Sequence, residues 1–262
     1  MRISPLFKIK RNVTLMVKNA HSLSLFVLFS LSSAAEASGF SVGGAVTAGD
    51  FGYKETDTKI LPFPLVNYEY GDFYFHALNA GYYLFRDSEN DVALNIGPGA
   101  LSYEPSDSND DRMRKLNKRK ISVMSGIMMN NRFRWGTFRT SVSSDVSDNS
   151  RGTVVDTAYL YPIRSGKVIV SPGFGVNWSD SQFNRYYYGI SPSEARRSGM
   201  AKYEPDDAMT CYMEMSALYQ VNKTWSLMSS IKVTELNSTV TDSNMVRGGL
   251  STQFVAGFGY AF

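Results

Sequence analysis

The chain has 262 residues, 43% of them hydrophobic, with 27 lysines and arginines against 24 aspartates and glutamates. The first 37 residues hold five of the basic residues and one of the acidic ones, so the remaining 22 basic and 23 acidic residues nearly balance. This balance removes the electrostatic basis for nucleic-acid binding. The single cysteine, Cys211, has no partner in the chain for a disulfide.

The N-terminal 37 residues have the pattern of a cleaved secretory signal peptide. Basic residues between Arg2 and Lys18 precede a largely apolar run from Leu23 to Leu31, and Ala35-Glu36-Ala37 provides a small-x-small cleavage site. We expect cleavage after residue 37, with cleavage after Ala35 and translation from Met16 as alternatives. The apolar run is shorter than the roughly 20 residues that a membrane-spanning helix needs, and no later run is longer.

The remainder, residues 38–262, is expected to form one domain of β-strands. Apolar and polar residues alternate with a period of two in segments 168–178, 209–221, 225–233 and 253–262, as in strands with one apolar and one polar face. In a membrane barrel the apolar faces point to lipid and the polar faces point inward. The inward candidates carry both signs of charge: Asn95, Arg139, Asp145, Asp156, Asn177, Glu214 and Lys232.

A soluble β-sandwich is the alternative, because its strands also alternate. The export signal favours a transmembrane antiparallel β-barrel in the outer membrane of a Gram-negative bacterium. Aromatic residues near the expected strand ends favour it too, since they suit the membrane interfaces: Trp135, Tyr161, Trp178, Tyr219 and Trp225.

The connections predict about 12 strands. Periplasmic turns are short and extracellular loops long. Short links are expected near residues 71–72, 87–90, 130–134, 165–166 and 222–224, and long ones near 49–58, 105–119, 147–152, 179–206 and 235–249. The alternation requires that segment 73–84 be divided by a sharp turn near residues 78–80. Counts of eight, ten or fourteen strands stay open.

The longest loop contains a local helix signal. Ser191 can cap a helix, Pro192 suits its first position, Glu194 completes a capping box and Gly199 can end it. We expect a short helix that orders this extracellular loop over the barrel mouth, with Tyr186, Tyr187 and Tyr188 packed beneath. Direct ligand binding by this loop is the alternative.

The same loop resembles the hallmark motif of the MipA/OmpV family of outer-membrane proteins. The matching residues are Tyr187, Tyr188, Gly189, Ser191, Glu194, Ala195, Ser198, Gly199 and Tyr203. The Pro-rich segment 60–75 resembles an early strand of that family, and the motifs most resemble those of the OmpV-like and YiaT-like branch. The resemblance implies an outer-membrane barrel, and in the best-known member a scaffold that joins a murein transglycosylase to a penicillin-binding synthase.

The C-terminal strand resembles the signal by which the barrel-assembly machinery recognises outer-membrane barrels. Its aromatic residues Phe258, Tyr260 and Phe262 share one face, and Phe262 ends the chain. The assembly machinery is therefore an expected partner.

A basic loop suggests contacts with lipopolysaccharide phosphates, which arginine and lysine bind through charge-assisted hydrogen bonds. The candidates within segment 108–120 are Arg112, Arg114, Lys115 and Lys118. A solvated loop without a ligand is the simpler interpretation.

Catalysis has little support. His76 is the only histidine after the signal, so a Ser-His-acid site would depend on it alone. No cluster of residues suits a metal, and no glycine motif suits a nucleotide, so we expect no catalytic residue, metal or cofactor. The hypotheses are a scaffold for envelope enzymes, a narrow channel, a surface that binds lipopolysaccharide or another extracellular partner, and, last, an enzyme.

Overall fold

The computed structural model describes residues 39–56 and 58–262. The expected signal peptide, both cleavage sites and the alternative start at Met16 lie outside the described residues. Among those residues, no helix is long and apolar enough to cross a membrane.

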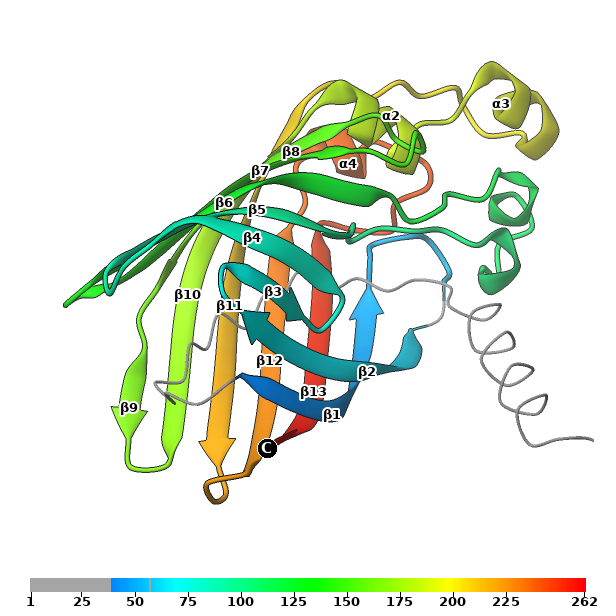
Figure 1. The fold of residues 1–262 in the computed structure, drawn as a ribbon. Coiled ribbons are helices and arrows are strands. Elements are labelled where there is room, and N and C mark those ends of the chain that lie inside the picture. The colour runs from blue at the N-terminus through cyan, green and yellow to red at the C-terminus, as the bar shows by residue number, and fades with distance from the viewer. Residues whose placement is uncertain (1–38, 57) are drawn as a thin grey trace, which may run out of the picture.

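The described chain is an antiparallel barrel with 12 strand positions (Figure 1), as the sequence predicts. The sheet closes because β10 pairs with β11 on one side and with β8 on the other. β9 continues β8 along the same edge of β10, after a break at Tyr161 and Pro162. Proline lacks the N–H that a ladder needs, which accounts for a break there.

The strands run as follows: β1 (Phe40–Asp50), β2 (Lys59–Tyr70), β3 (Phe73–His76), β4 (Asn79–Arg86), β5 (Asn90–Pro98), β6 (Val123–Phe133), β7 (Gly136–Asp145), β8 (Thr153–Leu160), β9 (Ile163–Ser165), β10 (Val168–Ser179), β11 (Ala208–Gln220), β12 (Trp225–Glu235) and β13 (Leu250–Ala261). The helices are η1 (Pro105–Asp107), η2 (Met113–Lys115), α2 (Ser181–Tyr188), α3 (Pro192–Ser198) and α4 (Ser238–Thr241).

The sharp turn expected within segment 73–84 is present. β3 and β4 form a tight hairpin around Ala77 and Leu78, and Ala77 has a φ of 55°. This hairpin restores the alternation of short and long connections, because it separates two strands that would otherwise be taken for one.

The two ends of the barrel differ. Figure 1 shows α2, α3 and α4 together at one end, which we call the loop end; the C-terminus and the β9–β10 and β11–β12 turns lie at the other, which we call the turn end. Loop-end side chains form an apolar core that includes Tyr53, Met113, Tyr187 and Met245. The loops are therefore packed together over the mouth.

The wall follows the alternation in the sequence. Phe254 and Phe258 of β13 are exposed on the outer face, whereas Val255 between them is buried inside. On β11, Met213 is 72% exposed while its neighbour Glu214 is buried. An apolar outside and a polar inside are what a strand between lipid and a lumen requires.

Candidate functional site

Residues 180–207, between β10 and β11, fold over the loop end, and we call them the lid. Ser191 caps α3 in a capping box: the Glu194 amide donates to the Ser191 hydroxyl, and the Ser191 amide donates to the Glu194 carboxylate. Gly199 ends α3 with a φ of 75°, a left-handed conformation that glycine adopts without strain. The capped helix predicted from the sequence is confirmed.

A buried ion pair joins the lid to the β5–β6 loop. Arg119 Nη2 lies 2.8 Å from Glu194 Oε1, and these side chains are only 7% and 3% exposed. The same carboxylate oxygen accepts a hydrogen bond from the Asn117 amide at 2.9 Å, and Arg119 also donates to the Gly189 carbonyl at 3.0 Å. Burial alone would raise the pKa of Glu194, but the donors from Asn117, Ser191 and Arg119 outweigh it and the pKa lies below its ordinary value.

The tyrosines of the lid contact the β5–β6 loop again and connect the lid to two further loops. Tyr187 is fully buried, and its hydroxyl accepts a hydrogen bond from the Ser122 amide at 3.2 Å. Tyr53, from the β1–β2 loop, donates to the Tyr187 carbonyl at 3.2 Å. The Tyr188 carbonyl accepts from the Ser243 hydroxyl at 2.6 Å, in the β12–β13 loop. The expected packing of these tyrosines under the lid is present.

The remaining motif residues complete the lid. The Ala195 carbonyl accepts from the Gly199 amide at 2.9 Å, and the Ser198 hydroxyl donates to the Glu194 carbonyl at 2.7 Å. Tyr203 donates through its hydroxyl to the Thr239 carbonyl at 2.9 Å. In this structure the motif residues therefore make contacts that shape and anchor the lid.

One lid helix, α2, was not predicted from the sequence. Asp180 is its N-cap, and the Asp180 carboxylate accepts a hydrogen bond from the Phe183 amide at 2.8 Å. Asn184 then bonds with Ser179 in both directions: Ser179 Oγ donates at 2.8 Å, and Asn184 Nδ2 donates to the Ser179 carbonyl at 3.1 Å. The Asp180 cap was the available signal, since aspartate is a preferred N-cap.

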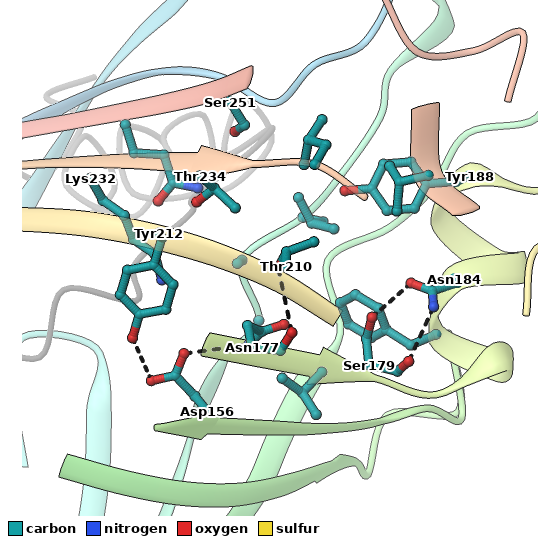
Figure 2. Close-up of a pocket in the computed structure, with 18 of the residues that line it drawn as sticks. Asp156, Asn177, Ser179, Asn184, Tyr188, Thr210, Tyr212, Lys232, Thr234 and Ser251 are labelled. Carbon is teal, nitrogen blue, oxygen red and sulfur yellow. Dashed lines mark hydrogen bonds between the residues drawn. The ribbon is translucent and has the colours of Figure 1, made fainter. Parts of the chain in front are cut away.

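A chamber of about 110 Å³ lies beneath the lid (Figure 2). A water needs roughly 10–15 Å³ of such space, so the chamber has room for several waters. Figure 2 shows Asn184 and Tyr188 of the lid at one side of the chamber, and Asp156, Tyr212 and Lys232 of the barrel wall at the other. Residues of the lid thus line one side of the chamber, and polar residues of the wall line the other.

Charged residues meet inside the wall. Arg139 on β7 lies 2.9 Å from Glu214 on β11, both nearly buried. The Tyr212 hydroxyl donates to Asp156 at 2.9 Å, and Lys232 Nζ lies 3.5 Å from the centre of the Tyr212 ring. Lys232 makes no hydrogen bond or ion pair through its side chain with any residue in the described part of the chain. All five residues point inward, and the four of them expected there from the sequence are confirmed.

Three other residues expected inside have different surroundings. Asn177 lies 3.5 Å from Asp156 at the chamber, and the Oδ1 atom of Asn95 is buried without a partner among the described residues. Asp145 orders the β7–β8 loop instead, because its carboxylate accepts hydrogen bonds from the Ser147 and Arg151 amides at 2.7 and 3.0 Å.

The basic residues expected to contact lipopolysaccharide are exposed on the β5–β6 loop. Three of them have acidic partners close by: Arg112 lies 3.2 Å from Asp110, Arg114 3.8 Å from Asp111 and Lys118 2.5 Å from Glu104. Lys115 is exposed. Their contact with lipopolysaccharide stays a prediction.

His76 ends β3 beside two charged residues. Its Nε2 atom lies 3.0 Å from Glu69, which also pairs with Arg86 at 2.9 Å. The His76 ring stacks on Tyr74 with centroids 4.8 Å apart. Within residues 39–56 and 58–262, no three histidine, cysteine or acidic side chains are grouped as a metal site would require.

The C-terminal aromatics lie on the outer face at the turn end. Phe262 stacks on Phe40 with ring centroids 5.3 Å apart, and Tyr260 contacts Trp225 at 5.1 Å. Phe258 is 46% exposed on the same face. Recognition of these residues by the assembly machinery stays a prediction.

Comparison with known proteins covers nearly the whole chain. Residues 42–262 match the family model described as MltA-interacting protein MipA. The chain is 38% identical to the MltA-interacting protein of Escherichia coli K12 over 92% of this chain and 98% of that protein. It is 34% identical to a protein named outer membrane protein YiaT in the same strain, over 94% and 100% of the two chains.

The outer membrane protein OmpV of Vibrio cholerae is more distant, with 24% identity over 70% of this chain and 71% of that protein. The sequence identity is therefore higher to the MltA-interacting protein than to YiaT or OmpV. The motifs had indicated the opposite, a chain nearer to YiaT and OmpV.

Proposed function

Because this chain belongs to the MipA family and forms an outer-membrane barrel, we propose that it is a non-enzymatic scaffold for enzymes that build and cut murein. The observation that carries the proposal is the covered mouth: the buried Arg119–Glu194 pair fixes the lid, and Arg139 and Glu214 pair on the inner side of the wall below it. A barrel covered in this way offers its rim and outer wall for contact. The name of the E. coli relative, MltA-interacting protein, supports a murein enzyme as the partner. A penicillin-binding synthase as the second partner follows only from the family resemblance.

The partner surface would include the outer wall as well as the turns. A stable interface usually buries more than about 1,000 Å² in total, more than turns of a few residues provide. Exposed aromatic side chains extend the turn-end surface: Trp135 stacks on Phe133 with centroids 4.9 Å apart, and they are 54% and 48% exposed. A membrane-anchored partner could contact such a rim from the lipid side.

Photocrosslinking in intact cells tests the scaffold. A photoreactive residue at Ser165 or Asn222, both exposed at the turn end, is expected to give adducts with a transglycosylase or a synthase. The same residue at Lys115, exposed at the loop end, is the matched control and is expected to give neither adduct. A folded barrel in the outer membrane without enzyme adducts from either turn-end position would refute the scaffold.

A narrow channel is the second candidate, and the chamber with Lys232 on its wall favours it. Under this alternative, liposomes containing the barrel would swell in small anionic solutes, and Lys232→Met would reduce the rate. Equal rates with and without the protein would remove the channel.

A further inference from the structure

The barrel wall has a gap beside β2. This strand pairs with β3 only from Asn67 to Tyr70, because β3 contains four residues. Between residues 59 and 65, the edge of β2 that faces away from β1 has no strand partner in the described part of the chain. Figure 1 shows the short β3 between β2 and β4.

Other segments frame this gap. The β3–β4 turn bounds it toward the turn end, and the end of β5 lies beyond that turn. At the loop end, Thr56 of the β1–β2 loop pairs with Ser108 of the β5–β6 loop, and the Asn109 amide donates to the Glu55 carbonyl at 2.7 Å. The gap is therefore a part of the wall that lacks strand pairing on one side, and we call it the window.

The sequence of β2 suits an edge without a partner. Val66 directs its carbonyl toward β3, where it accepts from the Ala77 amide at 2.9 Å. Alternate residues of an antiparallel strand direct their backbone groups to the same side, so Ile60, Pro62 and Pro64 face the window. An unpaired N–H in lipid costs several kcal/mol, and proline has none. Two of the three donors at this edge are thus absent.

The inner side of the window is apolar, unlike the charged interior near the chamber. Phe63 and Leu65 point inward, each 6% exposed, and pack with Val255 and with Leu78 of the β3–β4 turn. On the outer side, Ile60 is 70% exposed where the wall faces lipid. Apolar surface therefore lies on both sides of an edge that lacks a backbone partner.

We propose that a lipid acyl chain enters the barrel wall through the window and contacts the apolar patch of Phe63, Leu65 and Leu78. A lipid is favoured because the outer side of the window, where Ile60 is 70% exposed, belongs to the face of the wall that contacts the membrane. A β-strand of another protein is disfavoured as the occupant. Pro62 and Pro64 have no N–H, so this edge of β2 offers such a strand only one backbone donor. A polar solute would find no charged group on this patch. The window lies in the loop-end half of β2, so the acyl chain comes from the outer leaflet, from lipopolysaccharide or a phospholipid.

Photocrosslinking to lipid tests the window. p-Benzoylphenylalanine replaces Phe63 in the full chain, the cells are irradiated, and the purified barrel is weighed by mass spectrometry. Folding is checked by migration of the unheated protein in a gel. We expect a gain of mass equal to a lipid, and the size of the gain separates a lipopolysaccharide adduct from a phospholipid adduct. If the variant with the probe at position 63 does not fold, the probe is placed at Leu65 instead.

Two further positions control the result. Leu218 on β11 also points inward and is buried, but its strand is paired on both sides, so we expect no lipid adduct there. Ile60 faces lipid and is expected to react. The proposal fails if Ile60 gains a lipid while the inward probe at Phe63 or Leu65 does not. It also fails if Leu218 reacts as strongly as Phe63, or if the Phe63 adduct is a protein.

Discussion

Glu194 is the residue with the most consequential contacts in the lid. Its carboxylate completes the capping box of α3 with Ser191, forms an ion pair with Arg119 and accepts a hydrogen bond from the Asn117 amide. The Glu194 side chain is almost fully buried. Removing one partner of a buried pair leaves the other charge without compensation, at a cost of about 3–5 kcal/mol. The lid therefore depends on one carboxylate.

Glu194→Ala is expected to loosen the lid, because Arg119 then stays buried without an anion. Protease cleavage within residues 180–207 of the folded barrel should become much faster than in the unchanged protein. Arg112→Ala is the control: it removes an exposed pair with Asp110 that contributes within about 1 kcal/mol. Equal cleavage of the Glu194→Ala and Arg112→Ala variants would contradict the role given to Glu194.

The lid is also expected to weaken in acid. The pKa of Glu194 is lowered on folding, so its contribution to stability is present above the ordinary glutamate pKa of about 4.3 and is lost as the pH falls through the lowered value. The protection factors of residues 180–207, which are corrected for the pH dependence of intrinsic amide exchange, should thus be high near neutral pH and fall in acid. Glu194→Gln should remove part of this dependence; an unchanged pH profile in that variant would rule Glu194 out as its source.

At the scale of elements, α3 is defined by its ends. Gly199 stops the helix at a positive φ, and a Cβ there would meet no atom within 4 Å. The requirement for glycine is therefore one of backbone conformation alone.

Gly199→Ala is expected to destabilise the end of α3 by about 1–2 kcal/mol, the cost of the left-handed conformation for a residue with a Cβ. Gly248→Ala is a matched control, because Gly248 also has free space around its Cβ position but no positive φ. Hydrogen exchange at the lid should increase in the first variant only. The same increase in both would show that φ at Gly199 is not the cause.

The elements predictable from the sequence are those with local signals. The wall strands show period two because each separates lipid from the interior, as at Phe254 and Val255, and α3 carries its own caps. The Arg119–Glu194 pair joins residues 75 positions apart, which no local pattern encodes. Arg119 lies within the basic segment 108–120, and no local signal distinguishes this buried residue from its exposed neighbours. The α2 helix was missed because its signal was limited to a cap at Asp180.

At the scale of the whole molecule, side chains and loops fill the barrel interior in two places. The lid covers the loop end, and below it Arg139 and Glu214 join β7 to β11, between which β8 and β10 lie in the wall. This pair therefore links the inner faces of two strands about a quarter of the ring apart, and it places both charges inside the barrel. This arrangement agrees with the proposed scaffold, whose partners would bind outside the barrel, and with the proposed lipid at the window.

Ion conductance in planar bilayers tests this closed interior most directly. The unchanged barrel, checked for folding before insertion, is expected to add no steady conductance steps, while a general porin inserted in the same way gives large ones. Long-lived open steps from the unchanged barrel would contradict the account, because ions would then pass the lid and the Arg139–Glu214 pair, and the channel would become the better description of its function.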